Sequence, residues 1–180
     1  SKKTKVIDCT FDISSSLKDR IEQIREEAET SVRQGSTCLI LSDQNISNHK
    51  ASIPSILVVG AVHSHLVKHG LRGYCSLNVE CSDALDTHSF AVLIGVGATT
   101  VNPYLAIDSI YQRFEKKLFG KSDFESCVVK FKKSIDAGLL KIMSKMGISV
   151  ISSYRGGCNF EAVGLSRAIV SDYFPGMSSR

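Results

Sequence analysis

The sequence predicts an α/β fold in which parallel strands alternate with helices. Three observations support this fold class. Short runs rich in β-branched and small apolar residues recur along the 180 residues, and stretches with helical periodicity separate them. The strand runs are apolar almost throughout, which is typical of parallel strands that are covered on both faces. With 43% hydrophobic and 22% charged residues, the composition indicates one compact globular domain.

Five strands are expected, and two architectures can hold them. The strand runs are Lys5–Phe11, Thr37–Ser42, Cys75–Glu80, Thr99–Asn102 and Ile148–Ser153. Such strands can form an open doubly wound sheet, or they can form part of a (β/α) barrel. The pattern alone does not choose between the two. We expect a single domain over residues 1–180, with loose ends at 1–4 and 175–180.

The first two helices have clear boundaries. Apolar residues at steps of three and four predict an amphipathic surface helix over Leu17–Gln34, with Ser16 as its N-cap and Gly35 as its stop. A second helix, Ser55–Lys68, follows Pro54. It is mostly apolar and is therefore expected to be well buried.

Four further helical segments follow. His88–Gly95 is short and apolar, and Tyr104–Leu118 begins after an Asn-Pro pair that suits an N-cap and a first helical turn. A capping box at Ser122 starts a helix that extends to Met146 and is expected to break at Gly138. The last helix is expected over Phe160–Tyr173, in two pieces around a glycine.

Cysteine usage and charge exclude several classes of protein. The six cysteines contain no C-x-x-C pair, so free structural thiols are favoured over a zinc site or disulfides. No signal peptide or membrane-spanning apolar run is present, which indicates a cytoplasmic chain without a membrane partner. The net charge is +4, and a lysine-rich stretch over 116–145 lacks interleaved aromatics. We therefore expect a solvated helix face and no nucleic-acid partner.

Polar side chains follow the strands where a substrate pocket would lie in either architecture. The residues expected to converge at this rim are Asp43, Asn45, Glu80, His88, Asn102 and Arg155. Two plainer explanations remain open. Short polar side chains in these loops often cap the next helix, which suits Asn102, and Asp43, Glu80 and Arg155 could form a buried ion-pair network.

Candidate sites for an anion, a metal or a nucleophile are weak. Arg155, Gly156 and Gly157 follow a predicted strand and could hold a phosphate or flavin, although a tight glycine turn explains them as well. Among the clustered histidines only His65 and His69 share a helix face, and no metal site is expected. No G-x-S-x-G motif is present, so no catalytic residue is assigned.

Several longer strings carry a resemblance to a known family. They are Leu39–Asp43, Ile53–His63, His88–Gly95, Val101–Ala106, Gly138–Ile148, Ser153–Gly156 and Phe160–Leu165. In their order and spacing they resemble the central domain of the glutamate synthase large subunit. The resemblance extends from about Val6 to Phe174 and corresponds to the C-terminal half of that domain.

The resemblance implies a multidomain oxidoreductase. In that family a glutaminase domain releases ammonia from glutamine, and the ammonia passes through a tunnel to a domain with FMN and an iron–sulfur cluster. There 2-oxoglutarate is aminated and reduced to glutamate. The central domain is implied to be a non-catalytic scaffold that links the two other domains and helps to wall the tunnel. It holds no cofactor itself, and the polar rim would serve domain contacts or the ammonia path.

Two further expectations concern the chain by itself. Separated from its neighbouring domains it should be inactive and should self-associate, because part of a barrel exposes sheet edges and apolar surface. The alternative is a free-standing FMN- or small-anion-binding α/β enzyme that uses Arg155, Gly156 and Gly157 as its phosphate site.

Overall fold

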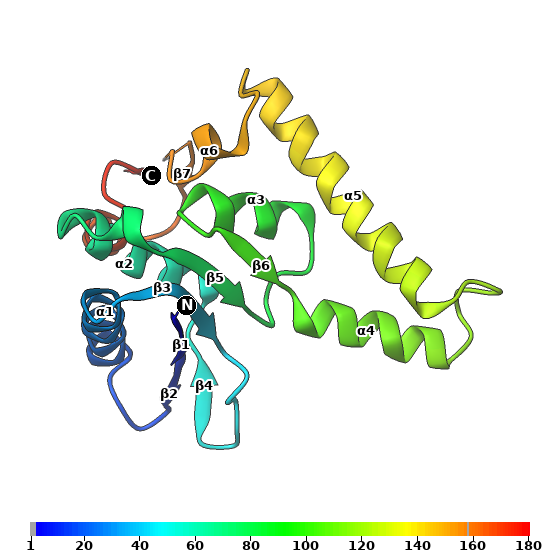
Figure 1. The fold of residues 1–180 in the computed structure, drawn as a ribbon, viewed down its shortest axis with the longest axis horizontal. Coiled ribbons are helices and arrows are strands. Elements are labelled where there is room, and N and C mark those ends of the chain that lie inside the picture. The colour runs from blue at the N-terminus through cyan, green and yellow to red at the C-terminus, as the bar shows by residue number, and fades with distance from the viewer. Residues whose placement is uncertain (1–2, 158) are drawn as a thin grey trace.

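A parallel sheet of four strands forms the centre of the molecule (Figure 1). The fold is given by a computed structural model that describes residues 3–157 and 159–180. The sheet has the order β1-β3-β5-β6, and its strands are β1 (Lys3–Asp8), β3 (Ser36–Ser42), β5 (Ser76–Glu80) and β6 (Thr100–Asn102). The α/β class predicted from the sequence is therefore confirmed, although the sheet has four strands instead of five.

The strand order follows the chain without reversal. The connections between neighbouring strands contain α1 (Leu17–Arg33), α2 (Ser55–Lys68) and α3 (Thr87–Gly95). Helix α2 packs against both α1 and α3, so these helices cover one face of the sheet. A doubly wound sheet reverses its strand order and has helices on both faces. The molecule is instead an open part of a (β/α) barrel.

Helices α1 and α2 begin and end close to the predicted positions, for local reasons. The Ser16 side chain accepts a hydrogen bond from the Asp19 amide at 3.3 Å and caps the first turn of α1. Along α1 the buried apolar residues are Ile21, Ile24, Ala28 and Val32. Helix α2 is buried along most of its length, and at Gly60 it meets Phe174 so closely that a Cβ would lie 2.2 Å from the ring.

The two faces of the sheet differ in character. On the face under the helices the side chains are fully or almost fully buried: Ile7, Leu39, Leu41, Leu77 and Val79. On the other face Val6 is 57% exposed, and Asn78 accepts a hydrogen bond from Thr100 Oγ1 at 2.7 Å. We call this second face the open face. It corresponds to the interior of a closed barrel, and here it is half polar and only partly covered.

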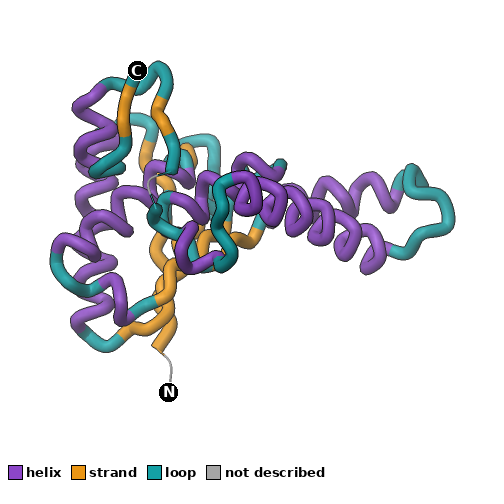
Figure 2. Tube along the Cα trace, turned by 90° about the horizontal axis from the view of Figure 1, so that it is seen from above, coloured by secondary structure: helices purple, strands orange, loops and turns teal. Residues whose placement is uncertain are grey.

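Two helices form an arm that projects from the sheet (Figure 2). They are α4 (Tyr104–Glu115) and α5 (Phe124–Lys145), and they pack against each other. Only Ala106 is buried along α4. The lysines predicted to lie on a solvated face are exposed: Lys116, Lys117, Lys121, Lys130, Lys132, Lys133, Lys141 and Lys145.

Short elements complete the fold. An antiparallel pair, β2 (Thr10–Asp12) and β4 (Lys50–Ser52), lies beyond the carboxyl ends of β1 and β3, and a 3-10 turn, Arg72–Tyr74, precedes β5. After α5 the chain forms α6 (Ile151–Tyr154), β7 (Glu161–Ala162), α7 (Arg167–Tyr173) and β8 (Ser178–Ser179). Among the described helices, none combines the length and apolar character that a membrane crossing requires.

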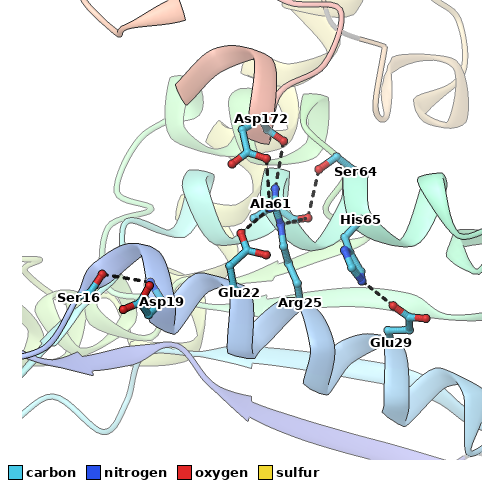
Figure 3. A network of polar contacts seen from close by, with 9 residues as sticks. All are labelled: Ser16, Asp19, Glu22, Arg25, Glu29, Ala61, Ser64, His65 and Asp172. Atoms are coloured by element: carbon cyan, nitrogen blue, oxygen red, sulfur yellow. Dashed lines mark hydrogen bonds and ion pairs between the residues drawn. The ribbon is translucent and has the colours of Figure 1, made fainter. Parts of the chain in front are cut away.

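Arg25 joins the C-terminal helix to the body of the molecule (Figure 3). Its guanidinium, only 7% exposed, contacts Glu22 at 2.7 Å, the Asp172 carboxylate at 3.2 Å and the Ala61 carbonyl oxygen at 3.3 Å. It also lies over the ring of Tyr173, 4.8 Å from the ring centre. One buried cation therefore connects α1, α2 and α7.

Three predicted elements differ from the structure. The strand expected over Ile148–Ser153 is wrong, because Val150 is extended and α6 begins at the next residue. The helix expected over Phe160–Tyr173 is replaced in its first part by β7 and a loop. Helix α5 passes through Gly138 without a break. At the C-terminus, expected to be loose over 175–180, β8 pairs with β7.

Candidate functional site at the carboxyl ends of the strands

A row of polar residues crosses the sheet where its strands end. The parallel register aligns Asp8 with Ser42, Ser42 with Glu80, and Glu80 with Asn102. Ser42 Oγ donates to Glu80 Oε2 at 2.8 Å, and Asn102 Nδ2 donates to Glu80 Oε1 at 3.2 Å. Because residues in register point to the same side of a parallel sheet, this row lies on the open face. Both oxygens of Glu80 are held in place by its neighbours on each side.

Asp43 lies one residue beyond this row and is 4% exposed. Its Oδ2 accepts two hydrogen bonds from Ser82, from the amide at 3.0 Å and from Oγ at 2.7 Å. Its Oδ1 is buried and makes no hydrogen bond within 3.5 Å to the described residues, although the Tyr104 phenol also interacts with this carboxylate. A buried carboxylate oxygen without a partner is unusual, because losing hydration without a compensating bond is unfavourable.

A small cavity lies next to Asp43. Its volume is about 10 Å³, close to the space that a single water-sized molecule needs. The lining contains both apolar and polar residues: Cys9, Leu41, Asp43, Ile53, Ser55, Val58, Val79, Glu80 and Cys81. A small polar molecule with N–H or O–H groups would satisfy Asp43 Oδ1 there.

Three ionisable side chains around Asp43 keep their protons at neutral pH. Burial, and then the approach of Asp43, raise the pKa of the Tyr104 phenol to about 12. Burial also raises the pKa of the Cys9 and Cys81 thiols to about 12. These three groups are therefore neutral at neutral pH, and the thiols are poor nucleophiles.

Asp83 fixes the start of α2 beside the same cavity. Its carboxylate accepts from the Ser55 amide at 3.0 Å and from Ser55 Oγ at 2.6 Å. Pro54, at the N-cap position, offers no side-chain acceptor, so Asp83 replaces the missing cap from a distant loop. The sequence places Ser82 and Asp83 after the third strand, but they were not included in the predicted rim cluster, and Tyr104 was missed. The uncapped start at Pro54 was the one available signal.

The remaining rim residues are placed less centrally. Asn45 is exposed, and its side chain forms a hydrogen bond with Asp8, which helps to lower the pKa of that carboxyl. Burial opposes this change in pKa, and hydrogen bonds from Thr10 contribute to the lowering. His88 is exposed in the first turn of α3, and the charge it interacts with is Asp86.

Arg155 lies at the opposite end of the sheet. Its Nε donates to the carbonyl oxygen of Ala98 at 3.1 Å, and Ala98 comes just before the start of β6. The expectation that Arg155 joins the rim depended on a fifth strand, and the segment forms α6 instead. Arg155 therefore has no part in an ion-pair network with Asp43 and Glu80.

The Arg155–Gly157 segment forms a tight turn, with the Gly157 amide donating to the Tyr154 carbonyl oxygen at 3.2 Å. Gly156 has a φ of +68°, which only glycine adopts easily, and a Cβ there would lie 3.0 Å from the His63 ring. Within the described part of the chain no helix begins directly after Gly157, so no helix N-terminus faces an anion. The glycine-turn interpretation fits this geometry, and an anion site at these residues stays a prediction.

A larger cavity, about 530 Å³, lies between α2 and the C-terminal segment that contains α7. His63 is part of its wall and accepts a hydrogen bond on Nδ1 from Arg72 Nε at 3.1 Å. Burial, and then the nearby Arg72 charge, lower the pKa of His63 to about 4. His63 is thus neutral at neutral pH, with its remaining ring proton on Nε2.

The described residues do not contain a complete catalytic set. No histidine ring among them is hydrogen-bonded to a serine or cysteine side chain, which nucleophilic catalysis would need. One further group was not expected from the sequence. Glu29 of α1 lies beside His65 and His69 of α2.

Comparison with known proteins identifies the family. A family model for the glutamate synthase central domain matches residues 1–166. The chain is 56% identical over 177 residues to a glutamate synthase [NADPH] large chain of Azospirillum brasilense, which covers 97% of this chain and 12% of that protein. It is 41% identical over 175 residues to a ferredoxin-dependent glutamate synthase of Pyropia yezoensis, which covers 91% of this chain and 11% of that protein.

A solved structure agrees with the fold. A mutant flavocytochrome b2 with pyruvate bound matches with a TM-score of 0.53 and 17% identity, over 79% of this chain and 37% of the other. At this identity the likeness concerns the fold alone. The chain spans about an eighth of the length of the first two curated relatives. With a family model that matches most of its length, the chain belongs to the glutamate synthase central domain family.

Proposed function

We propose that this chain is the scaffold and connecting domain of a glutamate synthase. It would join the glutaminase and FMN domains of one polypeptide, in the cytoplasm. The whole protein would convert glutamine, 2-oxoglutarate and a reductant into two molecules of glutamate, with FMN and an iron–sulfur cluster held by other domains. The observation that carries this proposal is the family match over residues 1–166 in a chain that spans about 12% of its relatives.

The open face of the sheet supports a connecting role. Val6 is 57% exposed there, and the outer edges of β1 and β6 have no strand partner among the described residues. Apolar surface and free strand edges of this kind are normally covered in a complete protein. We therefore propose that neighbouring domains cover them, and that the chain self-associates when it is isolated.

We also propose that Asp43 lies on the ammonia path. Its partnerless Oδ1 lies beside a cavity of about 10 Å³, and ammonia is a molecule of that size class with N–H groups to donate. The neutral Tyr104 and Cys81 nearby would not trap it as an ion or react with it. The role is one of passage and positioning and involves no bond making.

The test uses the native polypeptide that contains this chain. Asp43→Asn should lower the share of glutamine-derived ammonia that reaches glutamate by about fivefold, as expected for one lost hydrogen bond of about 1 kcal/mol. Glutamine hydrolysis and glutamate formation from added ammonia should both continue. Asp136→Asn, which changes an exposed carboxylate on α5, is the matched control.

Two results would count against the proposal. If Asp43→Asn transfers ammonia as well as the unchanged polypeptide, Asp43 is not on the path. If the isolated chain purifies with stoichiometric flavin, it is more than a scaffold. If light scattering shows that the isolated chain is a monomer, the proposed self-association is wrong, and the scaffold role is not affected.

A further inference from the structure

Three potential metal ligands meet between the last turns of α1 and α2. They are Glu29 from α1, His65 from α2 and His69, the residue that caps the end of α2, and Figure 3 shows Glu29 facing His65. One ligand atom from each residue lies within 4.8 Å of the other two. His65 Nε2 is 2.7 Å from Glu29 Oε2, and His69 Nε2 is 3.8 Å from the same oxygen.

The ring of His69 is oriented as a metal ligand requires. Its Nδ1 lies 2.8 Å from the carbonyl oxygen of His65, so Nδ1 carries the proton and donates it. The lone pair is then on Nε2, which faces Glu29. A hydrogen bond from the other ring nitrogen to a backbone carbonyl is the usual support of a ligating histidine.

The three proposed ligands are accessible. The side chains of Glu29, His65 and His69 are 21%, 17% and 33% exposed. An ion can therefore reach the three ligands from solvent without a rearrangement of the backbone.

Two opposing electrostatic effects act on a cation at this point. Helices α1 and α2 both end near this point, and the negative end of each helix dipole favours positive charge. Two cationic side chains oppose it. Arg33 contacts Glu29 Oε1 at 2.8 Å, and Lys68 lies in the last turn of α2. Arg33 leaves Oε2 available, because it occupies the other oxygen.

We propose that Glu29, His65 and His69 bind a divalent transition-metal ion, with Zn²⁺ as the preferred ion. Two imidazoles and one carboxylate are a known zinc ligand set that leaves the fourth position for water. When zinc is tetrahedral and its bonds to nitrogen and oxygen are about 2.0–2.1 Å long, the ligand atoms lie about 3.3 Å from one another. The distance of 3.8 Å between His69 and Glu29 is near this value. His65 Nε2 and Glu29 Oε2 are 2.7 Å apart, so this contact must open slightly, and the proton on His65 Nε2 must move to Nδ1 or to solvent before Nε2 can bind the ion. The bound ion would join α1 to α2.

The experiment is a titration of the untagged chain with Zn²⁺ and with Co²⁺. We expect one ion of high affinity per chain, and visible Co²⁺ absorption bands without the near-ultraviolet bands of thiolate ligation. Glu29→Gln, His65→Gln and His69→Gln should each weaken Zn²⁺ binding by at least about 100-fold. His88→Gln, which alters an exposed histidine elsewhere, should leave it unchanged.

Arg33→Gln separates a metal site from a plain ion-pair cluster. Removing the opposing charge should tighten Zn²⁺ binding if Glu29 is a ligand. The proposal is overturned if the unchanged chain binds Zn²⁺ no more tightly than the His65→Gln variant. It is also overturned if the Co²⁺ spectrum shows thiolate ligation that persists in all three ligand variants. Circular dichroism of each variant confirms that the fold is retained.

Discussion

The sheet with its covering helices and the projecting arm differ in how they are stabilised. In the body of the molecule, Leu39 and Leu77 are fully buried between the sheet and the helices. In the arm, Ala106 is the buried residue of α4, and α5 buries Cys127, Ile135 and Met143 along its length. The body therefore has a core of its own. Helix α5 joins that core through Ile135, with Phe131 and Leu139 packed against it, whereas α4 contributes none of its side chains to it.

Aromatic contacts hold the far part of the arm together. The ring centre of Phe124 lies 5.4 Å from that of Tyr111 and 6.0 Å from that of Phe114. Nearer the body, Phe131 meets Phe90 of α3 with ring centres 6.4 Å apart. Local contacts of this kind support two paired helices but do not build a core. The comparison shows that a chain of one family domain can contain regions of very unequal stability.

The largest expected effect separates the two regions directly. Leu77→Ala should lower the free energy of unfolding by about 2–5 kcal/mol, because it leaves a cavity in the core. Leu140→Ala on α5 should change it by no more than about 0.5 kcal/mol, since that side chain is 66% exposed. Urea unfolding followed by circular dichroism measures both. Equal losses in the two variants would contradict the division into a core and an arm.

Acid should lower the free energy of unfolding of the body, because His63 becomes protonated when the chain unfolds. Its pKa is about 4 in the folded chain and about 6.5 when unfolded, so the folded state resists protonation. The stability that depends on neutral His63 is present above about pH 6.5 and is lost as the pH falls toward about 4. The loss reaches roughly 3 kcal/mol.

Urea unfolding between about pH 7 and about pH 5 tests this, because most carboxyls titrate below that range. His63→Gln should remove the slope in this window, whatever its effect at neutral pH. A slope that survives in the variant would assign the pH dependence to other groups.

The smallest effect concerns the contact between the two regions. A Cβ at Gly138 of α5 would lie 2.4 Å from Thr87 Cγ2 of α3. Gly138→Ala should therefore lower the free energy of unfolding by about 1–2 kcal/mol, even though alanine favours helix. Adding Thr87→Ala should recover part of the loss, which a double-mutant cycle measures. A gain in stability from Gly138→Ala alone would show that α3 and α5 do not meet this closely.

Local signals in the sequence were sufficient for most of the fold. The apolar periodicity and the Ser16 cap predicted α1 to within a residue of its end, and α2 was predicted with its observed bounds. The segment after α5 was predicted incorrectly. Its β-branched residues resemble a strand, but a short apolar run does not distinguish a strand from a short helix. The error moved Arg155 from one end of the sheet to the other.

The two candidate sites also differ in how far local sequence patterns predict them. The end of each strand could be read from local pattern, and the parallel register then aligned Ser42, Glu80 and Asn102. Glu29 lies on α1 and His65 on α2, and only the packing of these two helices brings them together. Periodicity within one segment contains no information about a ligand from another.

The contact between Gly138 and Thr87 gives the arm a mechanical property. From Gly138 to Phe124, α5 extends for about 21 Å, and beyond the contact of Phe131 with Phe90 it is supported by α4. Gly138 is the point about which this stretch can tilt. A tilt of about 10° at Gly138 moves the Phe124 end of the helix by roughly 4 Å. A tilt of α5 too small to disturb the core would thus move the end of the arm by several ångströms. A neighbouring domain in contact with that end would be displaced with it.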